Sequence, residues 1–252
     1  MRLFLRDKRN LAILLGQVPL LALAIAGLFG SAVFAAGGEP NEAAQILFLL
    51  ITTSIWLGSI DASREVIKER SVASRESAVG VRLRAYLLSK LAVMFSLVIV
   101  QTLMLAAIVL LLRPLHEPAS VYLEVIGILL VTGLVAVCMG LLVSAAVRTE
   151  DQATSFIPLV LIPQLLFGGA IVPVASMAAP LDTLSAVVFA RWSFAGVGTA
   201  VDMNERVAAD PGPASAYGPS FFDLAALPAA VILALFVAAF LLGAGALLRR
   251  PG

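Results

Sequence analysis

Side chains able to do acid–base, nucleophilic or metal chemistry are scarce in this sequence of 252 residues. Its one histidine, His116, stands in a short polar stretch without evident partners, so we interpret it as a surface residue. Its one cysteine, Cys138, lies within an apolar run and is most simply a small packing residue. A single cysteine excludes an internal disulfide and a cysteine-based zinc cluster. The pattern disfavours an enzyme, and we expect no metal site and no cofactor in this chain.

Charged side chains gather in one segment, residues 61–90, where acids and bases alternate with apolar residues. Asp61 with Arg64 and Glu65 with Lys68 form pairs of opposite charge three residues apart, a spacing that supports a helix. A solvated charged linker is the simpler alternative. The mixture of signs and the spaced apolar residues favour a docking surface for a cytoplasmic partner.

Polar and aromatic side chains within the apolar runs are the remaining candidates for a binding site. One run carries Thr52, Thr53 and Trp56, and a later run carries Phe156, Gln164 and Phe167. For each residue taken singly, ordinary packing is the favoured alternative, because Thr and Gln bond neighbouring helices and Trp anchors membrane interfaces. No ionisable residue lies well inside a run, which disfavours a carrier coupled to protons or ions.

Long runs without charged residues predict the helices that must position these polar and aromatic side chains. Hydrophobic residues make up 61% of the chain and charged residues 13%, against about 25% charged in soluble domains. Runs of about 18 or more uncharged residues are long enough to span a bilayer. They cover residues 10–38, 43–60, 91–112, 125–147, 152–181 and 224–248. We therefore predict an all-α polytopic membrane protein with six transmembrane helices, forming a single domain over residues 1–252.

Two of these runs are too long for one simple helix. The first ends in small residues at 35–38, so we expect its helix to stop near residue 34. The fifth contains four prolines, which kink helices. We expect a kinked span over about 153–172 and then a hairpin that re-enters the membrane over about 174–190. Hairpin and following loop together make an outer segment, residues 174–222.

The basic residues predict the orientation. Fourteen of the 17 Lys and Arg residues fall at the two termini, in the segment 61–90 or at Arg148, which places these parts in the cytoplasm. Both termini are then cytoplasmic, as an even number of spans requires. Residues 1–10 suit an amphipathic helix on the inner leaflet, with an unstructured basic tail as the alternative. A net charge of +1 provides no basic surface for nucleic acid.

Several motifs resemble one family of membrane proteins. Glu69-x6-Glu76, with Arg75 before the second acid and then Gly80, resembles the first cytoplasmic loop of ABC-2 type permeases. The likeness is greatest to the White/G-type branch and to bacterial exporters linked to forkhead-associated domains. Further matches in the same order and spacing are the segments 5–10, 14–20, 148–153, 158–169 and 190–193.

The resemblance implies the fold of a type II ABC exporter and a plasma-membrane location. It implies that an ABC ATPase, holding ATP and Mg, grips the cytoplasmic coupling loop 61–84. The ATPase must be a partner or a fused domain, since the chain lacks a G-x-x-x-x-G-K-[ST] phosphate loop. Residues that the resemblance assigns to coupling are Glu69, Arg70, Arg75 and Glu76.

The same resemblance assigns the path of the substrate. Spans 2 and 5 of two protomers, a homodimer or a pair of similar permeases, would line a central cavity with Thr52, Thr53, Trp56, Phe156, Gln164 and Phe167. Ala170 and Ile171 align with the outer gate. The substrate would be apolar or amphipathic, such as a lipid, a glycolipid or a drug-like molecule, and membrane lipids would surround the protein. The alternative is a scaffold or regulatory subunit that transports nothing.

Overall fold

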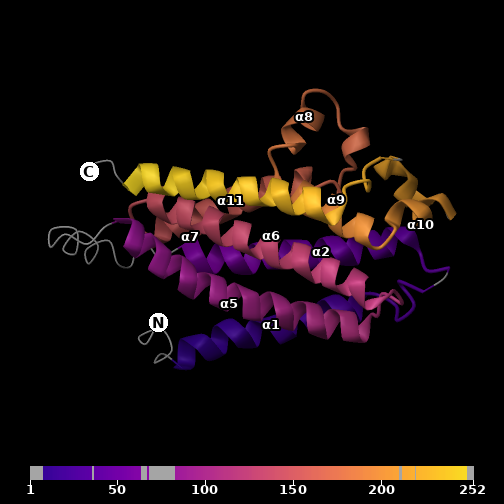
Figure 1. The fold of residues 1–252 in the computed structure, drawn as a ribbon, viewed down its shortest axis with the longest axis horizontal. Coiled ribbons are helices and arrows are strands. Elements are labelled where there is room, and N and C mark those ends of the chain that lie inside the picture. The colour runs from indigo at the N-terminus through magenta and orange to yellow at the C-terminus, as the bar shows by residue number, and fades with distance from the viewer. Residues whose placement is uncertain are drawn as a thin grey trace.

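The computed structural model describes residues 8–35, 37–63, 67, 83–209, 212–218 and 220–248. Within these ranges the chain is helical and has no strand, and its long helices lie side by side (Figure 1). Five of the described helices are long and apolar enough to cross a membrane. The prediction of an all-α polytopic membrane protein is confirmed.

The described helices include the five candidate spans and six shorter elements. The five candidate spans belong to α1 (Lys8–Leu28), α2 (Pro40–Ser63), α5 (Leu83–Leu112), α6 (Ala119–Ala146) and α11 (Ala226–Leu248). Between α6 and α11 lie α7 (Glu150–Phe167), η2 (Val174–Ser176), α8 (Leu181–Ser185), α9 (Phe189–Ala200), α10 (Met203–Ala209) and η3 (Pro213–Tyr217).

Small residues allow α2 and α6 to approach closely at the centre of the bundle. A Cβ atom added at Gly140 would lie 2.5 Å from the Ser59 carbonyl oxygen, and one added at Gly58 would lie 2.7 Å from the Gly133 carbonyl oxygen. Ser59 Oγ also reaches across to the Ala136 carbonyl at 3.4 Å. Helices in membranes associate through such small-residue contacts. Lipid tails are as apolar as the helix surfaces, so close packing replaces the hydrophobic effect as the main attraction.

The remaining long helices pack around this pair. Helices α5 and α1 lie on one side, with α1 against α5, while α11 and α9 lie against α6 on the other (Figure 1). Helix α7 packs mainly against α2. Apolar residues from every one of these helices join the main buried core. A second, smaller cluster joins α2, α5 and α6 around Ala62, Met94 and Leu141.

The chain reverses direction at two ends of the bundle. We call the left end of the bundle in Figure 1 the near end and the right end the far end. Helices α1 and α5 begin at the near end and α2, α6 and α11 end there, whereas α10 lies at the far end (Figure 1). At the far end, Arg206 of α10 donates to the Phe34 carbonyl at 2.9 Å and pairs with Glu117 at 3.1 Å. Arg113 donates to the Phe29 carbonyl at 2.9 Å. These cations tie the connecting segments of the far end to one another.

Helix α7 corresponds to the predicted fifth span but is shorter than that span. Thr149 caps its N-terminus by accepting a bond from the Gln152 N–H, and Glu150 and Asp151 occupy its first turn. The helix contains Pro158 and Pro163 and ends at Phe167 after 18 residues. It is not among the five candidate spans, so the count of six spans stays a prediction.

The first helix ends earlier than expected, at Leu28 and not near residue 34. Arg113 binds the carbonyl of Phe29, and Gly30 follows directly, so the chain leaves the helix for a turn. In the predicted coupling loop, α2 runs through Ser63 and α5 begins at Leu83, which makes the described parts of the loop helical. Residues 64–66 and 68–82 lie outside the described residues, as do residues 1–7 of the predicted amphipathic helix.

The predicted outer segment contains η2, α8, α9, α10 and η3. Helix α8 projects from the side of the bundle and lies along its length, not beyond its far end (Figure 1). Leu181 and Leu184 of α8, and Val187 shortly after it, are exposed. The position and exposed apolar residues of α8 suit a hairpin that re-enters the membrane, which stays a prediction.

Candidate functional site

A groove of about 540 Å³ lies between α1 and α2 and holds three of the predicted cavity residues. Thr52, Thr53 and Trp56 all line it, from the face of α2 that turns toward α1. We call this site the α1–α2 groove. Its full lining is Gln17, Leu20, Leu21, Thr52, Thr53, Trp56, Leu57, Ile60 and Asp61.

The α1–α2 groove is apolar along most of its length and polar in a narrow strip. Trp56, whose side chain is 46% exposed, presents its ring on the surface of the bundle. Thr52 and Thr53 add hydroxyl groups, and Gln17 adds an amide from the opposite helix. Mostly apolar walls with a few polar groups are the usual lining of a small-molecule site.

Asp61 forms the polar end of the groove and contacts a neighbouring helix. Its Oδ2 accepts a hydrogen bond of 2.9 Å from Nε2 of Gln101, a buried residue of α5. The same nitrogen donates to the Leu14 carbonyl of α1 at 3.0 Å. Three helices therefore meet at one polar junction beside the groove.

The predicted cavity residues of α7 do not line the α1–α2 groove. Phe156 is 47% exposed on the outside of the bundle. Gln164 is buried, and its Oε1 accepts a hydrogen bond of 3.1 Å from the Ala190 N–H, so this side chain holds α7 to the start of α9. Phe167 packs partly buried against the main core. Within one copy of the chain, only the α2 members of the predicted set come together.

The two residues predicted for the outer gate follow the C-terminus of α7. Ala170 packs partly buried against the core, and its carbonyl accepts a weak hydrogen bond of 3.5 Å from the Tyr217 hydroxyl. Ile171 is 60% exposed. Between them and α7 stands Gly169 with φ +99°, a conformation that suits glycine and allows the chain to turn away from the helix.

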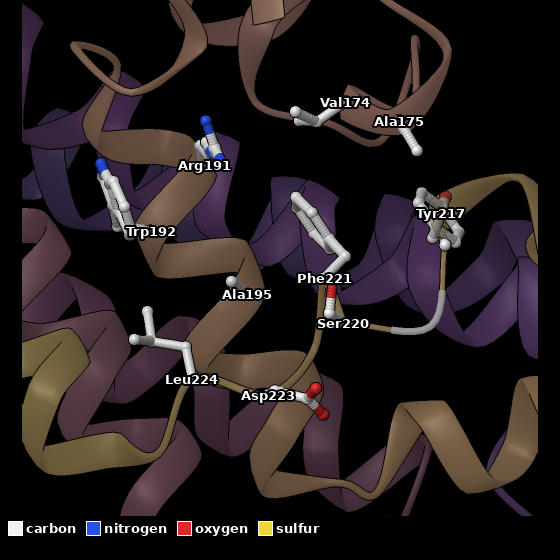
Figure 2. Close-up of a pocket in the computed structure, with 11 residues that line it drawn as sticks. Val174, Ala175, Arg191, Trp192, Ala195, Tyr217, Ser220, Phe221, Asp223 and Leu224 are labelled. Carbon is white, nitrogen blue, oxygen red and sulfur yellow. The ribbon is translucent and has the colours of Figure 1, made fainter. Parts of the chain in front are cut away.

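A second cavity, of about 380 Å³, lies in the half of the bundle nearer the far end. Figure 2 shows Arg191 and Trp192 of α9 on one side of it and Phe221 and Tyr217 across from them. Val174 and Ala175 of η2, together with Ser220, Asp223 and Leu224, complete most of the lining. We call it the α9 cavity.

Two groups of the α9 cavity have shifted pKa values. Burial lowers the pKa of Arg191, and the nearby charge of Asp182 opposes that shift. Burial among aromatic rings raises the pKa of Tyr217 to about 12, so its hydroxyl stays neutral at physiological pH. The cavity therefore presents a cation and a neutral phenol.

Sequence reasoning missed Asp61 as a groove residue and missed the α9 cavity entirely. Asp61 directly follows an uncharged run and was placed in a loop, but α2 continues past it. A polar Gln101 in the middle of another run was the available signal, since such a residue needs a polar partner. The coupling residues Glu69, Arg70, Arg75 and Glu76 lie outside the described residues.

The described part of the chain is a helical membrane bundle with an apolar groove along its second helix. The model of the family described as ABC-2 type transporter matches residues 1–200, and the chain belongs to this family.

Among curated proteins, the chain is similar to the ABC transporter ATP-binding/permease protein Rv1747 of Mycobacterium tuberculosis (strain ATCC 25618 / H37Rv). The two are 34% identical over 182 residues, which is 70% of this chain and 21% of the relative. The chain thus spans about a fifth of the length of that relative.

Proposed function

We propose that this chain is the membrane-spanning permease of an ATP-driven exporter in the plasma membrane. The α1–α2 groove, in a chain of the ABC-2 family, is the observation that carries the proposal. A permease needs a surface that holds substrate within the bilayer, and this groove lies between two candidate spans. The chain is no ATPase; hydrolysis belongs to a partner or a fused domain.

The substrate class follows from the walls of the groove. Leu20, Leu21, Leu57 and Ile60 suit a hydrocarbon or ring system, while Thr52, Thr53 and Asp61 suit a polar head. An amphipathic molecule, such as a lipid, a glycolipid or an amphipathic drug, combines both parts. ATP and Mg would bind the ATPase, and the chain itself would hold no cofactor.

An ABC ATPase is the partner that such a permease requires. The similar protein from Mycobacterium tuberculosis is named as an ATP-binding/permease protein, which joins both activities in one chain. The charged segment between α2 and α5, with Glu69, Arg70, Arg75 and Glu76, is the proposed contact with the ATPase. Salt bridges there would transmit the closure of the ATPase to the helices that continue into the membrane.

Two copies of the chain, or one copy with a similar subunit, would complete the path. Exposed apolar side chains of α7, among them Phe156, Leu159 and Ile162, offer a surface for the second subunit. Ala170 and Ile171 would then close the outer end. With both termini in the cytoplasm, as the distribution of Lys and Arg indicates, the near end of the bundle faces the ATPase.

The coupling role is tested by Glu76→Ala in cells that express the transporter with its ATPase. Untargeted comparison of lipids and metabolites between a deletion strain and its parent first identifies the exported compound. We expect Glu76→Ala to reduce ATP-dependent export of that compound by at least about tenfold, since one charge-assisted contact amounts to about 1.5–3 kcal/mol.

Glu205→Ala is the matched control, because Glu205 is an exposed acid of α10 at the far end. It should leave export unchanged. Normal export by a Glu76→Ala protein that reaches the membrane in normal amounts would contradict the coupling role. Absence of any exported compound, with the ATPase present and active, would contradict transport itself.

A further inference from the structure

The α9 cavity has the chemistry of an anion site. Arg191 is half-buried, and its Nη1 donates to the backbone carbonyl of Asp182 and to the hydroxyl of Ser185. Both acceptors are uncharged. In the described part of the chain, no carboxylate oxygen comes within ion-pair distance of this guanidinium; the ion pair found there joins Arg206 and Glu117. A guanidinium carries five N–H donors, so Arg191 retains donors for another acceptor.

Aromatic rings border the guanidinium on the side of the cavity. The Arg191 guanidinium carbon lies 5.1 Å from the centroid of the Trp192 ring, at cation–π distance. The indole is fixed by a hydrogen bond of 2.8 Å from Nε1 to the Ala186 carbonyl. Phe221 faces the same space from across the cavity (Figure 2). A cation held among rings binds an anionic group whose remaining parts are apolar or uncharged.

Asp223 is the one carboxylate among the lining residues, and it lies on the side away from Arg191, whereas Asp182, whose charge acts on Arg191, is outside the lining. Asp223 is exposed, and its Oδ1 accepts a hydrogen bond of 2.6 Å from Nδ2 of Asn204. Figure 2 shows its carboxylate below Ser220 and pointing away from Arg191. Ser220 adds an exposed hydroxyl to the wall. The cavity therefore offers a cation at one end and hydroxyl or carboxylate acceptors at the other, which suits a head group with one anion and nearby hydroxyls.

The surroundings of the cavity are apolar and exposed. Ile171 and Val172 precede η2, and Leu181, Leu184 and Val187 belong to the segment around α8; all five project from the protein. In a membrane protein, such an apolar surface contacts lipid chains. A molecule with its head in the α9 cavity would have its chains beside this surface.

We propose that the α9 cavity binds the phosphate group of an anionic membrane lipid, with Arg191 as the cation that recognises it. Trp192 and Phe221 enclose the part of the head group next to the phosphate, and the exposed apolar residues around α8 contact the acyl chains. Arginine suits this role because its planar fork of N–H groups matches phosphate oxygens. The lipid comes from the leaflet at the far end, whichever substrate the permease exports.

Trp192 provides a direct measurement of this binding. The chain has two tryptophans, so a Trp56→Phe variant leaves Trp192 as the sole reporter. The purified protein is titrated in mixed micelles with phosphatidylglycerol or phosphatidylcholine carrying the same brominated acyl chains, which quench nearby indoles. We expect phosphatidylglycerol to quench at about tenfold lower mole fraction, the ratio that a charged hydrogen bond of about 1.5 kcal/mol gives.

Two pairs of variants separate recognition from folding. Arg191→Gln should abolish the preference for phosphatidylglycerol, whereas Arg113→Gln should keep it, because Arg113 binds the Phe29 and Leu112 carbonyls outside the cavity. Since Arg191 also holds the segment around α8, a second pair leaves its bonds intact. Ser220→Glu should abolish the preference by adding a negative charge to the cavity wall, and Ser220→Gln should keep it.

Inorganic phosphate distinguishes a lipid from a soluble anion. At constant ionic strength, millimolar phosphate should leave the quenching by brominated phosphatidylglycerol unchanged. Full relief of quenching by phosphate would show that a free anion occupies the cavity and would contradict the lipid. Equal quenching by both brominated lipids, or loss of the preference in Arg113→Gln or Ser220→Gln as well, would overturn the anion site.

Discussion

Asp61 is the residue at which the candidate groove meets the packing of the bundle. Its carboxylate accepts from Gln101, which in turn donates to α1, so one side chain of α2 contributes to the contact among three helices. A buried amide that loses its acceptor costs about 1–3 kcal/mol. The residue thus belongs both to the lining of the groove and to the stability of the helices that form it.

Replacing Asp61 should lower stability in proportion to the acceptors that are lost. We expect Asp61→Leu to lower the free energy of unfolding by about 1–3 kcal/mol, because Gln101 then has one acceptor fewer in an apolar interior. Asp61→Asn retains an acceptor oxygen and should cost less. Thermal denaturation of the purified protein in detergent measures both. An equal loss in the two variants would show that the hydrogen bond to Gln101 contributes little.

At the scale of single residues, the sequence was sufficient where a pattern lay on one helix. Thr52, Thr53 and Trp56 fall on one side of α2, and they do line one groove. Gln164 illustrates the limit: its amide accepts from Ala190, 26 residues away, and no local pattern reveals that contact. The α9 cavity was missed for the same reason, since its walls come from η2, α9 and the segment after η3.

The contact between α2 and α6 depends on residues without large side chains. Gly58 of α2 and Gly140 of α6 bring the two backbones together, and a methyl group at Gly140 would meet the Ser59 carbonyl oxygen at 2.5 Å. That oxygen belongs to the backbone of a helix and cannot move alone. Any enlargement at this position therefore displaces one helix from the other.

Gly140→Ala should destabilise the protein by about 1–3 kcal/mol, the usual cost of overpacking a well-packed contact. Gly127→Ala is the matched control on the same helix, because a Cβ atom there has no neighbour within 4 Å. It should be neutral or stabilising by roughly 1 kcal/mol, since alanine favours helix more than glycine does. The measurement is the thermal midpoint of each variant in detergent. A control variant as unstable as Gly140→Ala would argue against the close approach.

The long elements were predicted well because charge is excluded from membranes and marks their ends. All five candidate spans overlap predicted ones, although α5 and α6 begin earlier than the uncharged runs do. Directly after the early end of α1, Arg113 binds the Phe29 carbonyl, a tertiary contact that no local pattern reveals. Helix α7 is the element for which the sequence decides least clearly whether it crosses the membrane. Its first turn is capped and acidic, and it contains two prolines.

For the whole molecule, the proposed second copy would cover the exposed face of α7. Phe156 lies on that face, and Leu235 lies on the exposed side of α11. Cys138 is the single native cysteine and is buried, so a Cys138→Ala background allows new cysteines to be placed one at a time.

We expect Phe156→Cys to form a disulfide-linked dimer when membranes are oxidised, because the same residue of two copies would lie near a shared axis. Leu235→Cys, on the exposed side of α11, should stay monomeric. Gel electrophoresis without reductant measures both. Cross-linking at Leu235 and not at Phe156 would place the interface on α11 and not on α7, and it would contradict the proposed dimer.

The most direct measurement of the proposed function is ATP-dependent transport and its dependence on the α1–α2 groove. Inside-out membrane vesicles containing the chain and its ATPase are given ATP and the compound that the deletion strain fails to export, and its accumulation is followed over time. Wild-type vesicles should accumulate the compound only with ATP. Trp56→Ala should reduce the rate at least about tenfold, because truncating an aromatic side chain that anchors a bound molecule costs about 2 kcal/mol or more. Leu235→Ala should transport normally. Accumulation at the wild-type rate by Trp56→Ala, or accumulation independent of ATP, would contradict the proposed function.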